Sequence, residues 1–194
     1  MWTRIGMALL IVLVVLSAIV ATRPDNYSIE RSAILSAPAE VIFPYVNDFR
    51  RWEEWSPFED LDPTMRKTYE GSPSGVDARY HWEGHGRAGE GRMRIAESEP
   101  ARRIAIDMQF IEPFESRSRT TFTFEPVANG TRVTWGMSGR NTTMGKAISL
   151  VASMDDMIGR EFEEGLAKLG TVAEAEARRL SSGVADTGEA ARAQ

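Results

Sequence analysis

The chain has 194 residues, of which 42% are hydrophobic and 26% are charged, and its net charge at pH 7 is −5. This length and composition allow one well-filled hydrophobic core with terminal extensions, so we expect a single domain. The negative charge excludes nucleic acid as a ligand class, and the absence of cysteine excludes disulfides, thiolate metal ligands and a cysteine nucleophile.

The N-terminus contains an uncharged apolar run, Ile5–Ala21, between Arg4 and Arg23. Its 17 residues would span about 26 Å as a helix, at the short limit for a hydrocarbon core of about 30 Å. A retained single-pass membrane anchor and a cleaved signal peptide both fit, and Ile19 is a poor match to a small-residue cleavage pattern, which favours the anchor. Positive charge is almost symmetric about the run, and the short N-terminus favours a domain on the extracytoplasmic side.

A folded domain is predicted after this segment. Residues 27–36 read as a strand, and Pro38 opens a short helix whose apolar face is Val41, Ile42, Tyr45 and Val46. Period-2 alternation between turn residues then predicts an antiparallel meander of six strands at Arg66–Tyr69, Ala78–Trp82, Gly91–Ala96, Arg103–Ile111, Arg119–Glu125 and Thr131–Ser138.

The alternation also assigns the two faces of the predicted sheet. The apolar face contains Ala78, Tyr80, Trp82, Met93, Ile95, Ile104, Ile106, Met108, Phe110, Phe122, Phe124, Val133, Trp135 and Met137. The solvated face contains Arg79, His81, Glu83, Arg92, Arg94, Arg103 and Asp107.

Helical periodicity from Thr143 to Leu180 predicts one long amphipathic helix that covers the apolar face of the sheet. The remaining residues, 181–194, are small and polar and are expected to be a disordered tail. The predicted organisation is therefore a membrane anchor or signal segment at 1–23, a domain at 24–180 and a tail at 181–194.

The runs SAPAEVIFPYVNDFRRWEEWSPFEDLDP, GVDARYHWEGHGRAGEGRMRI, TFTFEPVANGTRVTW and MIGREFEEGLAKL resemble the START-like superfamily, in particular its bacterial polyketide cyclase/dehydrase-type members, often called SRPBCC proteins. The resemblance covers roughly Tyr27 to Leu169. It implies an α+β helix-grip fold, in which a curved antiparallel sheet wraps around a long C-terminal helix and encloses a deep apolar cavity. It is specific for fold and says little about function, because the superfamily includes lipid-transfer domains, cyclases, hormone binders and chaperone regulators.

The stretch RRWEEWSPF places Trp52, Trp55 and Phe58 among charged residues. In a helix-grip fold this segment lies beside the cavity entrance. Three interpretations remain open: the rings close the end of the core, they contact a ligand as a lid, or they dip into a membrane.

Two further features carry alternatives. One side of a predicted strand contains His81, Glu83 and His85, residue types that bind metal ions. Because Tyr80 points to the inner face of the sheet, these three side chains point to solvent, and no metal is predicted. Asp155 falls inside the apolar stripe of the last helix, either with an internal partner such as a Tyr, Trp or Arg of the sheet or as a polar contact for a ligand.

Function follows from the cavity that the resemblance implies. The favoured hypothesis is a membrane-tethered module that binds a hydrophobic or aromatic small molecule, or a lipid, without a cofactor. The alternatives are a cyclase/dehydrase-like enzyme and a protein-interaction role without ligand. The candidate cavity and lid residues are Trp52, Trp55, Phe58, Tyr80, Trp82, Met93, Met108, Phe110, Phe122, Trp135, Asp155, Ile158 and Phe162.

Overall fold

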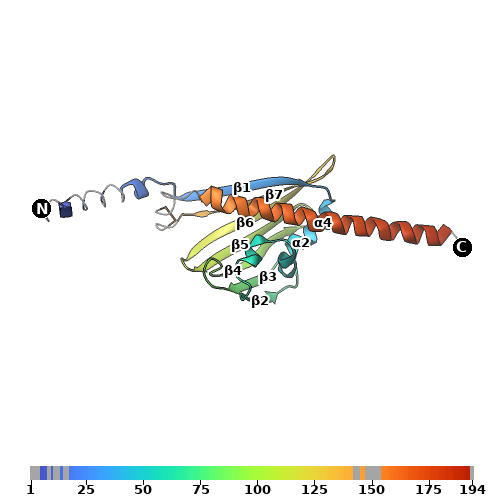
Figure 1. The fold of residues 1–194 in the computed structure, drawn as a ribbon, viewed down its shortest axis with the longest axis horizontal. Helices are drawn as coiled ribbons and strands as arrows, with labels where there is room; N and C mark the ends of the chain where they lie inside the picture. Colours follow the sequence, from blue (N-terminus) through green and yellow to red (C-terminus); the bar gives the residue numbers. More distant parts are fainter. Residues whose placement is uncertain are drawn as a thin grey trace.

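A computed structural model of the chain describes residues 5–7, 10, 14, 18–141, 145–146 and 154–192. Seven antiparallel strands form one curved sheet in the order β1-β7-β6-β5-β4-β3-β2, so that the first strand lies beside the last (Figure 1). The strands are β1 (Asn26–Leu35), β2 (Arg66–Gly71), β3 (Ala78–Glu83), β4 (Glu90–Glu99), β5 (Arg103–Glu112), β6 (Ser116–Val127) and β7 (Gly130–Arg140). Each predicted strand is present, and most are longer than the alternation indicated.

Four helical elements pack on one face of this sheet or beside it. They are α2 (Ala39–Asn47), the 3-10 helices η1 (Phe49–Glu54) and η2 (Pro57–Asp60), and the long α4 (Met154–Arg192). The predicted start of the last helix, at Thr143, lies in a region of which the structure describes residues 145–146 and then 154 onward. Its predicted end at Leu180 is wrong, because α4 continues to Arg192 through the segment expected to be a disordered tail. Ala, Glu and Arg near its end are good helix formers, and extending a formed helix needs no new nucleus.

The inner face of the sheet is the one that the alternation indicated. Its predicted apolar residues are buried, except that Met108 and Phe110 are half-buried. Of the predicted apolar face of α2, Ile42, Tyr45 and Val46 are buried and Val41 is half-buried. Phe43, which the helical pattern missed, is also buried.

One helix is too narrow to cover this sheet. A helix about 10–12 Å wide covers roughly two strands spaced about 4.8 Å apart. Accordingly α4 contacts β1 and β7, together with α2, η1 and η2 (Figure 1). The inner face of β3, β4 and β5 is therefore not covered by α4, and this is where a hollow can remain.

Two glycines, Gly159 and Gly165, bring α4 close to the sheet. A Cβ at Gly165 would lie 2.7 Å from Cζ3 of Trp135, and one at Gly159 would lie 2.1 Å from a guanidinium nitrogen of Arg31. A larger residue at Gly165 would push the helix away from the buried ring of Trp135, whereas one at Gly159 would displace the guanidinium end of the Arg31 side chain.

The predicted membrane span, Ile5–Ala21, falls largely outside the described residues. Of this run the structure describes residues 5–7, 10, 14 and 18–21, all of them helical. Within the described part of the chain, no helix combines the length and the apolar character that a bilayer crossing needs.

Candidate ligand cavity

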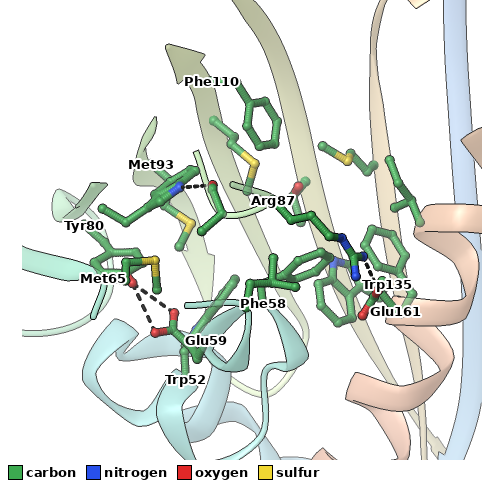
Figure 2. Close-up of a pocket in the computed structure, with 18 of the residues that line it drawn as sticks. Trp52, Phe58, Glu59, Met65, Tyr80, Arg87, Met93, Phe110, Trp135 and Glu161 are labelled. Carbon is green, nitrogen blue, oxygen red and sulfur yellow. Dashed lines mark hydrogen bonds and ion pairs between the residues drawn. The ribbon is translucent and has the colours of Figure 1, made fainter. Parts of the chain in front are cut away.

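A cavity of about 400 Å³ lies between the inner face of the sheet, the η2 segment and α4 (Figure 2). This volume is within the range of small-molecule sites. Ten of the thirteen candidate residues line it, namely Trp52, Phe58, Tyr80, Trp82, Met93, Met108, Phe110, Trp135, Ile158 and Phe162.

Trp55 and Phe122, by contrast, do not line the cavity. Trp55 is 1% exposed, and its indole nitrogen donates a 3.0 Å hydrogen bond to the carbonyl oxygen of Tyr45. Its ring meets those of Phe122 and Trp135 edge to face, with centroids 6.0 and 5.4 Å apart. Trp55 therefore closes the end of the core, as the first of the three interpretations had it.

Unlike Trp55, both Trp52 and Phe58 line the cavity. Trp52 is 3% exposed and donates from its indole nitrogen to the carbonyl of Val46 at 3.0 Å, so it is a fixed part of the cavity wall. Phe58 is half-buried and packs edge to face on Trp135 and Phe162 with centroids 6.0 and 6.5 Å apart. Phe58 is thus the ring of this segment that is placed to act as a lid.

Sequence reasoning missed nine lining residues. They are Glu59, Leu61, Met65, Arg87, Ala88, Thr120, Met137, Met157 and Glu161. The signals for some were present: Thr120 continues the inward alternation of Phe122, and Glu161 follows Ile158 by three residues on the helix. Glu59 had no such signal, because a carboxylate next to Phe58 in a charged stretch is indistinguishable from a solvated one.

Glu59 is the main polar group of the cavity wall. Its side chain is 6% exposed, and the hydroxyl of Tyr80 donates one hydrogen bond that is shared between its two carboxylate oxygens, at 3.0 and 3.1 Å. The ammonium group of Lys67 lies 2.7 Å from Oε2 of Glu59 and 2.9 Å from Oε1 of Glu53. Tyr69 stacks on Tyr80 with ring centroids 5.1 Å apart.

These contacts and burial shift the pKa values of Tyr80 and Lys67. Burial raises the pKa of Tyr80, and the charge and hydrogen bond of Glu59 raise it further, so the phenol stays neutral and acts as a donor. Burial alone would lower the pKa of Lys67, but hydrogen bonds and charges from Glu59 and Glu53 outweigh it and raise that pKa. Lys67 is therefore a cation that balances the carboxylate of Glu59.

A second polar pair lies at the mouth. Arg87, in the hairpin between β3 and β4, is 3.2 Å from Oε1 of Glu161 on α4, and its side chain is 76% exposed. The exposed Met157 lies on the same helix and also lines the cavity. Figure 2 shows this pair and the Glu59–Tyr80 pair on opposite sides of the cavity.

Two interactions hold the hairpin at the mouth. The indole nitrogen of Trp82 donates to the carbonyl of Ala88 at 3.1 Å. The carboxylate of Asp62 accepts from the backbone N–H of His85 at 2.7 Å and from the hydroxyl and backbone N–H of Thr64 at 2.6 and 2.8 Å. The hydrogen bonds from Thr64 and His85 lower the pKa of Asp62 to about 2.

Asp155 lies outside the cavity, and the expectation that its carboxylate is buried is wrong. Its side chain is 54% exposed, and its oxygens lie 3.0 and 3.1 Å from the guanidinium of Arg31 on β1. Arg31 also contacts Glu163 at 2.7 Å. Of the expected partner types, Tyr, Trp or Arg of the sheet, it is an Arg that contacts Asp155, but the pair is exposed and not internal. The helical periodicity misplaced Asp155 because this residue lies in the first turn of the described α4, at the edge of the sheet.

Neither His81 nor His85 lines the cavity. Nε2 of His81 is 3.1 Å from Oε1 of Glu90, and Nδ1 is 3.8 Å from Oε1 of Glu83. In the part of the chain that the structure describes, no three side chains of the His, Asp or Glu type converge as a metal site would require.

A curved antiparallel sheet, a long C-terminal helix and an apolar cavity between them define a helix-grip protein with room for a small molecule. The chain belongs to the family described as polyketide cyclase / dehydrase and lipid transport, whose model matches residues 27–174. No protein of curated function matches the sequence.

Solved structures share the fold. The di-domain ARO/CYC StfQ from the steffimycin biosynthetic pathway superposes with a TM-score of 0.61 at 12% identity, over 79% of this chain and 52% of that one. An uncharacterized protein from Rhizobium leguminosarum gives a TM-score of 0.57 at 16% identity, over 78% of this chain and 96% of that one. Protein CV1439 from Chromobacterium violaceum gives 0.56 at 17% identity, over 76% and 96%. At these identities the likeness concerns the fold alone.

Proposed function

We propose that this protein is a membrane-tethered binding module that holds a hydrophobic small molecule in the helix-grip cavity. The observation that carries the proposal is the cavity of about 400 Å³, whose wall is mostly aromatic and aliphatic. Burial of an apolar ligand against such a wall is favourable at roughly 25 cal/mol per Å² of apolar surface removed from water. The family description, which includes both cyclases and lipid transport, agrees with a ligand of this kind.

Methionines make up an unusual share of the cavity wall. They are Met65, Met93, Met108, Met137 and Met157. Unbranched thioether side chains adapt to ligands of different shape, and they make favourable contacts with aromatic rings. This composition supports a cavity that adjusts to its ligand, including a ring system.

The described part of the N-terminal segment supports the tether. Five of its large apolar side chains are 40–62% exposed and so do not pack on the domain: Ile5, Met7, Leu10, Val14 and Ile19. Exposed apolar side chains of this kind are expected to contact an apolar surface, and the length and composition of the apolar run fit the hydrocarbon core of a bilayer. The proposed orientation places the domain on the extracytoplasmic side.

The cavity mouth faces the same direction as this segment. The start of β1 pairs with the end of β7, which pairs with the start of β6. The start of β6 pairs with the end of β5, which pairs with the start of β4. The hairpin between β3 and β4, which contains Arg87, therefore lies at the same end of the sheet as the start of β1. Asn141, which follows β7, hydrogen-bonds Pro24 and Asp25 and thereby fixes the exit of the N-terminal segment at this edge. Figure 1 shows this segment and the first turns of α4 at one end of the sheet. A tether at this edge would hold the mouth near the membrane surface.

One observation favours an enzyme as the second candidate. Glu59 and Tyr80 form a hydrogen-bonded carboxylate and phenol in the cavity wall, and such a pair can move a proton to or from a bound substrate. The similar fold of StfQ, named as an ARO/CYC, is compatible with this role. Chemical conversion of the extracted ligand by the wild-type protein, and its loss in Glu59→Gln, would support the enzyme.

Native mass spectrometry of the full-length protein, purified in detergent, tests the binding function. We expect a co-purifying apolar molecule, and its mass would identify the ligand class. The variant Met108→Trp fills the cavity and should lose this ligand. Gln109→Trp is the matched control on the outer face of the same strand and should retain it. Equal occupancy in both variants would show that the bound molecule does not lie in the cavity. No bound molecule and no uptake of added apolar probes would favour a protein-interaction role without ligand.

A further inference from the structure

An unpartnered hydrogen-bond donor lies in the cavity wall. The indole nitrogen of Trp135 is buried, and in the described part of the protein it has no hydrogen-bond partner. Trp135 is 2% exposed and lines the cavity. A buried N–H without an acceptor is costly and rare, and an oxygen of a ligand in this cavity would satisfy it.

An acceptor with spare capacity lies elsewhere in the same wall. The four lone-pair sites of the Glu59 carboxylate receive the Tyr80 hydroxyl, shared between both oxygens, and the Lys67 ammonium group at Oε2. Lys67 does not line the cavity, so it compensates the charge of Glu59 without occupying ligand space. Oε1 of Glu59 is left able to accept one more hydrogen bond.

We propose that Glu59 and Trp135 select the ligand by its polar groups: Glu59 accepts from a hydroxyl, and Trp135 donates to an oxygen such as a carbonyl. The ligand class is an uncharged, mainly apolar molecule with a hydroxyl group, and free carboxylic acids are rejected. This inference rests on the proposed binding function and specifies its ligand.

Charge in the cavity wall explains the rejection of carboxylates. An anionic ligand head near Glu59 would meet a second negative charge in a poorly solvated site, where like charges repel strongly. Arg87 at the mouth attracts such a head weakly, because it is 76% exposed and already paired with Glu161.

The test of Glu59 is competition between matched probes in equilibrium dialysis of the full-length protein, with the same detergent in both chambers. The probes are 2-naphthol, 2-naphthoate and 2-methylnaphthalene. We expect wild-type protein to prefer 2-naphthol over 2-naphthoate by about tenfold or more, since a hydrogen bond to a charged acceptor has that strength. Glu59→Gln should remove most of this preference while 2-methylnaphthalene still binds.

Glu53→Gln is the matched control. Glu53 also contacts Lys67, at 2.9 Å, but its side chain is 57% exposed and lies outside the cavity. The control should therefore keep the wild-type preference. An unchanged ratio of 2-naphthol to 2-naphthoate in Glu59→Gln would overturn the inference while leaving binding intact. Failure of all three probes to bind would refute the proposed function itself, and the inference with it.

Trp135 is tested with a second pair of probes, 2-acetylnaphthalene and 2-ethylnaphthalene, which differ by a carbonyl oxygen. Trp135→Phe keeps an aromatic ring but removes the N–H donor. We expect it to weaken binding of the acetyl probe by about fivefold relative to the ethyl probe. A thermal melt confirms that the variant is folded, and Trp55→Phe, which removes an indole N–H outside the cavity, is the control for general destabilisation. Equal losses for both probes would overturn the role of Trp135.

Discussion

Trp135 of β7 and Phe162 of α4 stack face to face, with ring centroids 4.1 Å apart and planes 9° from parallel. Both residues are 2% exposed, and both also line the cavity. This stack joins the C-terminal helix to the sheet directly beside the ligand space. The same pair of rings therefore stabilises the fold and shapes the site.

The first prediction concerns this stack. Phe162→Ala should lower the free energy of unfolding by about 3–5 kcal/mol, because it removes a large buried ring and leaves a void between α4 and β7. Phe162→Asp should prevent folding, since it would bury an unpaired charge. Urea unfolding measures the first effect, and Met157→Ala, a change at an exposed position of the same helix, should alter stability little. A wild-type stability in Phe162→Ala would contradict the helix packing.

The second prediction separates core from lid in the tryptophan segment. Trp55→Ala should lower the free energy of unfolding by about 3–5 kcal/mol, because it empties a core position and leaves the carbonyl of Tyr45 without its donor. Phe58→Ala should destabilise less, since Phe58 is half-buried, and should weaken binding of an apolar probe. Thermal melts and probe fluorescence measure the two effects. The reverse order of stabilities would show that Phe58, and not Trp55, is the core residue.

The sheet was predictable because its alternation is regular. Period-2 positions such as Tyr80 and Trp82 fix which face is buried, and a shift by one residue would expose them all. Six of the ten candidates that line the cavity followed from the same alternation, namely Tyr80, Trp82, Met93, Met108, Phe110 and Trp135. Trp55 was not separable from Phe58 by sequence, because local spacing does not tell which ring of an irregular segment reaches the core.

The burial of two carboxylates, Glu59 and Asp155, was not predictable from the sequence pattern. Periodicity placed Asp155 in the apolar stripe, but its position in the first described turn of α4 leaves it exposed beside Arg31. Glu59 has no periodicity at all, and its burial depends on Tyr80 and Lys67, which are 21 and 8 residues away in the chain. Such polar contacts depend on tertiary structure, which a local pattern does not encode.

The third prediction is a pH dependence at the mouth. The pKa of Asp62 is about 2 in the folded protein, below the ordinary 3.8, so its carboxylate stabilises the fold above pH 3.8. This contribution is lost as the pH falls from 3.8 towards 2, because the proton that binds removes the acceptor for Thr64 and for the backbone N–H of His85. Asp62→Asn should therefore have a lower melting temperature than the wild type at pH 7.

The difference between wild type and Asp62→Asn should shrink below pH 3.8 as the wild-type carboxyl becomes neutral. His85→Ala is the control: the hydrogen bond comes from the backbone of His85, so the wild-type pH profile should persist. A difference that stays constant down to pH 2 would show that the charge of Asp62 has no part in holding the hairpin.

The fourth prediction concerns the end of α4. Leu180, Ser181 and Ser182 are exposed, and the last apolar side chain on α4 that packs against the core is Ala177, among the residues whose side chains the structure describes. Removal of residues 183–194 should leave the melting temperature within about 2 °C of the full-length value, since surface changes away from the core have small effects. A large drop would show that the end of the helix has a stabilising contact of its own.

The last prediction tests the tether and the direction of the mouth together. Removal of residues 1–23 keeps Pro24 and Asp25, which hydrogen-bond Asn141, so the domain should remain folded and bind an apolar probe. The shortened protein should leave the membrane fraction, whereas the full-length protein should stay in it with an intact mass that includes the first 23 residues. A mature chain that begins near Thr22 would instead identify a cleaved signal peptide.

Because the mouth and the exit of the N-terminal segment share one edge of the sheet, full-length protein in vesicles should also exchange an apolar probe with the bilayer faster than the shortened protein does. Equal exchange rates would show that the tether does not present the mouth to the membrane, and protease added to spheroplasts would establish on which side the domain lies.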